Sequence, residues 1–180
     1  PKWVKESIFY QIFPDRFYDG NPDNNVKENE YIYLNQNAYT HKDWYELPVF
    51  QADFYGWDIK GIQDKISYFL DFGINALYLN PIFESLSNHK YDIKDYNNVD
   101  KHFGTNEDLL NLVTSLHKKN IKIILDGVFN HTAERNKWFD KHNEYESFGA
   151  FESIESPFFN YYNFIKWPTD YFCWWGYDTL

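Results

Sequence analysis

The sequence predicts an α/β fold built on a parallel sheet. Three short apolar segments of the β type alternate with two amphipathic helical segments along the first 131 residues. The last strand, within Ile123–His131, is rich in Ile, Leu and Val without alternation, which is typical of a parallel strand covered on both faces. It breaks into Asp126, Asn130 and His131, and ligands bind at the carboxyl ends of such strands. Both the start of a barrel and a doubly wound sheet fit this order.

The strands before it are short and end at proline or polar residues. The first is expected at Ile8–Phe13, where Pro14 stops it. A loop rich in turn-forming residues follows, and residues 26–57 have many aromatics and no clear period, so we expect an ordered excursion there. The second strand is Ala76–Leu79, which ends at Asn-Pro. The absence of Gly-x-Gly-x-x-Gly after the first strand disfavours a dinucleotide-binding fold.

Two helices separate these strands. The first is expected over Ile59–Phe72, with Asp58 as its N-cap and Gly73 as its C-terminal stop. The second runs from Thr105 to Lys119, where Thr105 and Asp108 resemble a capping box and two lysines suit the negative end of the helix dipole. Both helices carry one apolar face, which predicts that they pack against the sheet.

Composition narrows the class of ligand. Aromatic residues make up 22% of the chain, more than one core of this size takes, so many should line a surface or cleft. Sugar rings and nucleobases both suit such surfaces, but a net charge of −10 argues against nucleic acid. Cys173 is the single cysteine, and no signal peptide or membrane-spanning run is visible, which predicts a cytoplasmic protein. With no methionine at all, the chain is expected to be a piece of a longer protein.

Four collinear segments resemble the α-amylase superfamily of glycoside hydrolases (family 13), and within it the neopullulanase, cyclomaltodextrinase and maltogenic amylase branch. They follow the family's order and spacing. The segments are Phe9–Phe17, Gly56–Gly61, Asn80–Ser85 with His89–Tyr96, and Asp126–His131.

The resemblance implies a (β/α)₈ TIM barrel of which this chain supplies strands one to three and helices one and two. Residues 1–131 would be the N-terminal part of that catalytic barrel, and residues 132–180 the loop-rich subdomain inserted after strand three, itself truncated. A full barrel needs roughly 250 residues. The family's catalytic carboxylates lie on later strands and are expected beyond Leu180, so this piece by itself is expected to lack hydrolase activity.

The resemblance also implies a substrate site for α-glucans such as maltodextrins, cyclodextrins or pullulan. Asp126, Asn130 and His131 match the family's first conserved region, in which the Asp holds the site and the His binds the sugar beside the cleaved bond. Tyr91 matches the aromatic platform under that sugar, flanked by His89 and Asp92. For each residue, core packing or a plain strand-end loop is the alternative. The tail's Trp167, Trp174 and Trp175 could stack distal sugars or fill a small core.

A structural calcium is the one cofactor implied. Hard cations take oxygen ligands, and the loop after the first strand offers several within seven residues. In this branch of the family the ion is held by that loop together with the Gly-x-Asp before helix one. The alternative is an Asx-rich turn with a helix cap. The ligands expected here are Asp19, Asn21, Asn24, Asn25, the carbonyl of Gly56, and Asp58.

Two other functions stay open. The chain could be a non-catalytic carbohydrate-binding fragment, or a metal-dependent hydrolase using His131, although it lacks a His-x-His or His-Glu-x-x-His ligand set. Three strands of an unclosed barrel would leave sheet edges and an apolar face exposed. We therefore expect the chain to self-associate, with no nucleic acid or membrane among its partners.

Overall fold

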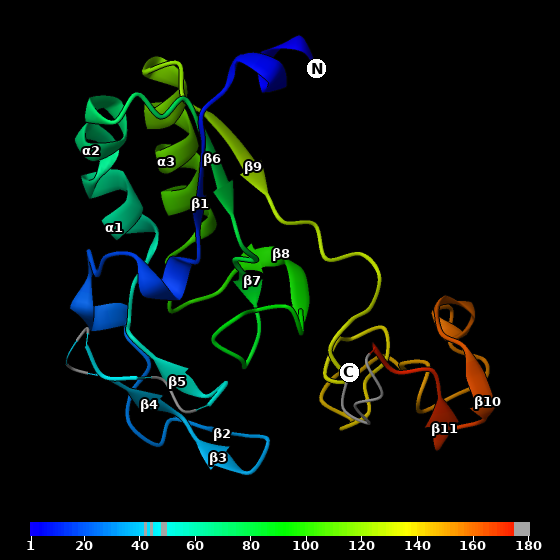
Figure 1. The fold of residues 1–180 in the computed structure, drawn as a ribbon. Coiled ribbons are helices and arrows are strands. Elements are labelled where there is room, and N and C mark those ends of the chain that lie inside the picture. The colour runs from blue at the N-terminus through cyan, green and yellow to red at the C-terminus, as the bar shows by residue number, and fades with distance from the viewer. Residues whose placement is uncertain (42, 44, 48–49, 175–180) are drawn as a thin grey trace.

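A three-stranded parallel sheet forms the centre of the protein. The computed structural model describes residues 1–41, 43, 45–47 and 50–174 (Figure 1). Strands β1 (Phe9–Ile12), β6 (Ala76–Leu79) and β9 (Lys122–Leu125) lie in the order β1-β6-β9. The register places Ile12 opposite Leu79 and Leu79 opposite Leu125, so all three carboxyl ends lie at one edge. The predicted α/β order is confirmed, and within the described residues the sheet is open rather than closed into a barrel.

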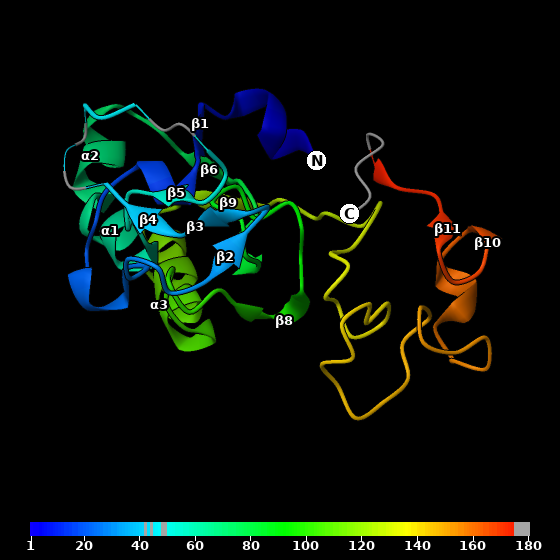
Figure 2. The same cartoon turned by 90° about the horizontal axis from the view of Figure 1, so that it is seen from below.

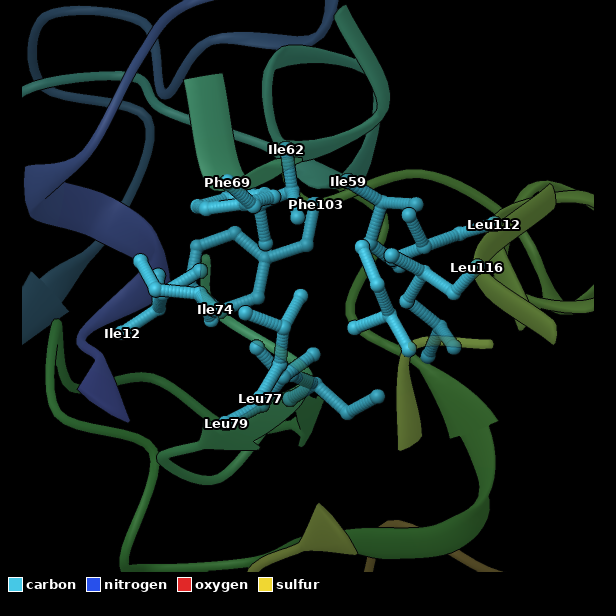
Figure 3. Close-up of a cluster of buried hydrophobic side chains, with 13 residues drawn as sticks. Ile12, Ile59, Ile62, Phe69, Ile74, Leu77, Leu79, Phe103, Leu112 and Leu116 are labelled. Atoms are coloured by element: carbon cyan, nitrogen blue, oxygen red, sulfur yellow. The ribbon is translucent and has the colours of Figure 1, made fainter. Parts of the chain in front are cut away.

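The core lies between this sheet and the helices. Figure 1 shows α1 (Ile59–Asp64), α2 (Ile66–Asp71) and α3 (Asn106–Lys118) on one side of the strands. Figure 3 shows side chains from α1 and α3 pointing toward those of β6. Burying each large aliphatic side chain contributes about 1.5–3 kcal/mol. The members of this core with 0% exposure are Ile59, Ile62, Phe69, Leu77, Leu79, Leu112 and Leu116.

The expectation of one helix over residues 59–72 is wrong. The helix is broken at Lys65 (φ −100°, ψ 14°), whose N–H donates to the carbonyl of Ile62, three residues back. The apolar face continues across the break through Ile66 and Phe69, so the periodicity does not reveal it. At this turn the ammonium of Lys65 lies 3.8 Å from the ring centre of Tyr18, in a cation–π contact.

The helix ends follow the sequence prediction. Gly73 has φ +70° after α2, and the N–H of Ile74 donates to the carbonyl of Phe69, which completes a Schellman turn. At the start of α3 the hydroxyl of Thr105 accepts from the N–H of Asp108, while the Asp108 carboxylate accepts from the N–H of Thr105. This reciprocal pair is the predicted capping box.

Strand β9 is not covered on both faces as expected. Its four residues are exposed or half-buried, because within the described residues β9 pairs only with β6 and has helices on one side. Ile123 and Leu125 pack against the core, whereas Ile124 shares the opposite face of the sheet with Gln11 and Tyr78. That face carries no helix in the described part of the chain. The apolar run therefore indicated a fully buried strand, whereas the described residues cover β9 on one face.

The excursion after β1 is ordered where it is described. Its pairs are the antiparallel β2 (Ile32–Tyr33) and β3 (Gln36–Asn37), and the parallel β4 (Tyr39–Thr40) and β5 (Asp53–Phe54). They surround a small cluster of Val26, Ala38, Phe54 and Tyr31. An antiparallel pair that the sequence did not predict, β7 (Phe83–Glu84) with β8 (Asp95–Val99), follows β6. Short 3₁₀ turns occur at Lys2–Glu6, Pro14–Arg16, Pro22–Asn24 and Phe159–Tyr161.

Residues after β9 form a loop-rich segment with its own aromatic cluster. Figures 1 and 2 both show this segment extending away from the central sheet. Its regular structure is the small pair β10 (Phe164–Lys166) and β11 (Asp170–Tyr171), and Phe139 contacts the rings of Tyr162 and Tyr171. No helix in the described ranges has both the length and the hydropathy needed to cross a bilayer. The division of the chain after His131, into the barrel part and the inserted subdomain, stays a prediction.

Candidate functional site

Polar side chains form a connected row along the carboxyl edge of the sheet. Gln11 in β1 donates from Nε2 to Oδ1 of Asn80, directly after β6, at 2.8 Å. Asn80 lies 3.5 Å from the hydroxyl of Tyr91, and that hydroxyl donates to Oδ2 of Asp126, directly after β9, at 2.8 Å. Sequence reasoning singled out Tyr91 and Asp126 but missed Gln11 and Asn80. The sequence feature that could have indicated them is their position, since each is a polar residue in or directly after a predicted strand.

His131 holds the same tyrosine from another side. Its Nε2 lies 3.1 Å from the backbone carbonyl of Tyr91, so the ring donates there, and its Nδ1 lies 3.4 Å from the Asn130 amide. Burial lowers the pKa of His131, against the opposing effects of the Tyr91 carbonyl and Asp92. A neutral imidazole with its proton on Nε2 fits both contacts. The structure therefore brings Tyr91, Asp126, Asn130 and His131 together.

Tyr91 is anchored by its hydroxyl and open on its ring. The residue remains 36% exposed although four neighbours bind its polar atoms. Burial, followed by the hydrogen bond to Asp126, raises the pKa of Tyr91 to about 12, so it stays protonated and donates. The pKa of Tyr78 in β6 is also raised, by burial and then by Asp126. The arrangement offers a flat, oriented aromatic face at the edge of the sheet.

His89 and Asp92 differ in how deeply they are buried. His89 lies beside Tyr91, with ring centres 5.9 Å apart, and its Nδ1 accepts from the N–H of Tyr91. Burial lowers the pKa of His89. Asp92 is 3% exposed and accepts from the hydroxyls of Ser85 and Ser87. The structure thus buries Asp92 as a support of the loop, with its Oδ1 3.9 Å from Nδ1 of His89.

A cavity lies next to this row, not over it. It has a volume of about 710 Å³, and His131 and Asn130 line it together with aromatic side chains of the tail. Trp174 lines it and stacks on His131, with ring centres 5.6 Å apart. Trp167 donates from its indole to the carbonyl of Ala150. Trp175 lies outside the described residues.

The predicted calcium ligands gather between the loop after β1 and the start of α1. Four of their side-chain oxygens are buried without a hydrogen-bond partner, and in the described residues only one further buried side-chain atom, a histidine nitrogen, shares that state. Unpartnered buried oxygens are costly, and a cation satisfies them. Burial and then the negative charge of Asp19 raise the pKa of Asp58, although the backbone N–H groups of Gly61 and Gly20 donate to it. The four oxygens are Asp19 Oδ1, Asn24 Oδ1, Asn25 Oδ1 and Asp58 Oδ2.

The other two predicted calcium ligands, Gly56 and Asn21, differ in how closely they approach the four oxygens. Gly56 has φ +74°, and a Cβ there would lie 2.3 Å from the side chain of Asn25, so the backbone approaches the cluster as a carbonyl ligand requires. Asn21 is exposed and its side chain accepts from the N–H of Asp23. No three His, Cys, Asp or Glu side chains in the described ranges gather to hold a metal ion. The cluster has only two carboxylates, with amide oxygens as its other side-chain donors, and this oxygen-only set fits calcium.

The tyrosine, the carboxylate and the histidine lie at the carboxyl ends of parallel strands, which is where α/β folds bind their ligands. The sequence pattern described as "Alpha amylase, catalytic domain" matches residues 11–174. The chain therefore belongs to the α-amylase catalytic domain family, as its resemblance predicted.

Named relatives agree with this assignment. The chain is 41% identical to the amylopullulanase of Thermoanaerobacterium saccharolyticum over 99% of its length and 15% of that protein. It is 39% identical to the cyclomaltodextrinase of Thermoanaerobacter pseudethanolicus over 93% of its length and 26% of that protein. The solved type III pullulan hydrolase of Thermococcus kodakarensis has a TM-score of 0.78 at 32% identity, over 99% of this chain and 32% of its own. The chain spans 11–15% of the amylopullulanases that it matches.

Proposed function

We propose that this chain is the substrate-orienting part of a retaining glycoside hydrolase that acts on α-glucans such as maltodextrins, cyclodextrins or pullulan. The observation that carries the proposal is the row Asn80–Tyr91–Asp126 at the carboxyl edge of the sheet, with His131 bound to the Tyr91 carbonyl. The names of the relatives, which include amylopullulanase and cyclomaltodextrinase, support the substrate class.

Each side chain of the row has a physical task toward a sugar. The exposed face of Tyr91 suits the CH face of a pyranose ring, and its hydroxyl is held by Asp126 so that the ring cannot turn away. The second oxygen of Asp126 and the imidazole of His131 can bind sugar hydroxyls. For His131 this requires the sugar to replace its contact with Tyr91 or Asn130. Contacts that strengthen toward an oxocarbenium-like transition state contribute several kcal/mol in such enzymes.

The covalent steps are proposed to use carboxylates outside this sequence. A retaining mechanism needs a nucleophile and an acid/base about 5–5.5 Å apart, and no pair in the row provides them, since Asp126 is its single carboxylate. The 180-residue chain alone is therefore expected to give no turnover of maltodextrin. Measurable hydrolysis by the purified chain would contradict this division of tasks.

The bound calcium would join the excursion to the first helix. Asp19, Asn24, Asn25 and Asp58 would hold it through the oxygens that have no partner, and the Gly56 carbonyl and Asn21 would complete the shell. The ion would supply charge compensation for two buried carboxylates and no chemistry toward the sugar. Since Asp58 is the N-cap of α1, the ion would fix the start of that helix.

The test uses the protein encoded by the whole reading frame, with maltotetraose, β-cyclodextrin and pullulan as substrates. Tyr91→Ala is expected to lower kcat/KM by roughly ten- to a hundredfold, because the platform is lost. Tyr91→Phe keeps the ring but loses the Asp126 hydrogen bond, so its loss should be smaller. Tyr45→Ala, at a tyrosine that is 87% exposed, is the matched control. Absence of activity on every α-glucan, or full activity of Tyr91→Ala, would refute the proposal.

A further inference from the structure

Lys90 is a fully buried lysine inside the loop that carries the candidate substrate residues. It is 0% exposed, although His89 and Tyr91 on either side of it reach the site surface. Its backbone is in the left-handed region, with φ +59°, which is unfavourable for a residue with a Cβ. Such a conformation persists only where surrounding contacts determine it, and it is enriched at functional sites.

The ammonium of Lys90 is bound by two oxygen acceptors and two aromatic rings. Nζ donates to Oδ2 of Asp100 at 2.7 Å and to the carbonyl of Ser85 at 2.9 Å. The rings of Phe54 and Phe103 lie 5.5 and 5.1 Å from it. A buried cation is tolerated only when it is paired in this way. The anchor therefore links the loop to β5 and to the turn before α3.

Asp100 is built to receive this cation. It is 2% exposed, and it also accepts from the backbone N–H groups of Ser85 and His102 and contacts the His102 ring. The positive charge of Lys90 and the contacts from His102 outweigh burial and hold the pKa of Asp100 well below its usual range. The carboxylate is therefore held in its ionised form beside the ammonium of Lys90.

The anchor determines where Tyr91 points. Because Lys90 turns inward at positive φ, the next residue projects to the opposite side, where its hydroxyl reaches Asp126, 35 residues further along the chain. The N–H of Lys90 also donates to the hydroxyl of Ser87, which binds His89 and Asp92. We propose that Lys90 is a positioning residue, whose buried ion pair with Asp100 holds the His89–Tyr91 turn so that Tyr91 forms the sugar platform. This inference rests on the proposed function.

The test is a double-mutant cycle in the whole enzyme. Lys90→Met keeps the length of the side chain but removes the ammonium, and kcat/KM for maltotetraose is expected to fall about ten- to a hundredfold, mainly through KM. Because Lys90 acts through Tyr91, adding Tyr91→Ala to Lys90→Met should cause little further loss, whereas the two losses would add if Lys90 were only structural. Lys60→Met, which breaks the exposed ion pair with Asp64, is the matched control and should leave activity unchanged.

Folding is checked by circular dichroism, and all assays are run well below the melting temperature. If Lys90→Met does not fold, Lys90→Gln, which keeps a donor without the charge, enters the same cycle. Additive losses, unchanged kcat/KM in a folded Lys90 variant, or failure of both variants to fold would each overturn the positioning role. An inactive wild-type enzyme would instead refute the proposed function, so the two failures are distinct.

Discussion

The unpartnered oxygens around Asp58 predict a calcium-dependent stability that one substitution should remove. Each buried oxygen without a partner costs about 1–3 kcal/mol, and four of them meet here. A ligand at a hundred times its dissociation constant stabilises the folded state by about 2.7 kcal/mol. For a cooperative unit of this size, 1 kcal/mol corresponds to roughly 2–4 °C. Saturating calcium should therefore raise the melting temperature by about 5–10 °C over its value in chelator.

Asp58→Asn separates the cation from the helix cap. An asparagine oxygen can still accept from the N–H of Gly61 and cap α1, but the charge that attracts the ion is gone. The folded-state pKa of Asp58 is raised, so in chelator its contribution to stability is present at low pH and lost as the pH rises. At pH 7 in chelator the variant should therefore be at least as stable as the wild type, and with calcium it should be less stable.

Scanning calorimetry of wild type and Asp58→Asn, in EGTA and in calcium chloride, measures this reversal in their order of stability. Asp64→Asn, on the exposed side of the same helix, is the control and should keep the full calcium increment. A melting temperature that is the same with calcium and with chelator would refute the site. An equal increment in wild type and Asp58→Asn would refute the assignment of Asp58 as a ligand.

Three further predictions concern stability and assembly. Burial raises the pKa of Asp15 from 3.8 to about 6. Its protonated form therefore stabilises the fold at low pH, and this contribution, roughly 3 kcal/mol, is lost as the pH rises through about 6. Urea unfolding of wild type and Asp15→Asn from pH 4 to 8 should show this difference, and parallel pH profiles of the two proteins would contradict it. Leu112→Ala, at a fully buried position of α3, should cost about 2–5 kcal/mol in chemical denaturation, whereas Leu110→Ala, 64% exposed, should cost little. The isolated chain should self-associate, because β1 and β9 each keep an unpaired edge in the described sheet; a monodisperse monomer in light scattering would count against this.

Local features of the site region were predictable because they depend on neighbours in sequence. The strand Ala76–Leu79 and the α3 capping box appear where residue type and spacing place them. Asp126 was predictable as the first polar residue after an apolar strand. These signals come from hydrophobic periodicity and from hydrogen bonds three or four residues apart, which the order of residues determines directly.

Other parts of the site depend on contacts between distant residues. Neither the break at Lys65 nor the β7–β8 pair has a signal in the pattern, since apolar spacing continues through the first and β8 is polar. The difference in exposure between His89 and Asp92, whose side chains lie 3.9 Å apart, was equally hidden, because burial in a loop depends on contacts with other segments.

The sequence by itself determined the three strands of the central sheet, the helical segments between them, the family, and the residue types at the two candidate sites. Only the tertiary structure decided that the hydroxyl of Tyr91 meets Asp126, that four oxygens converge without partners, and that Lys90 is a buried anchor. The physical reason is that burial and pairing set the energy of a polar group. Both depend on chain segments that fold together from far apart, and the pattern of neighbouring residues does not contain them.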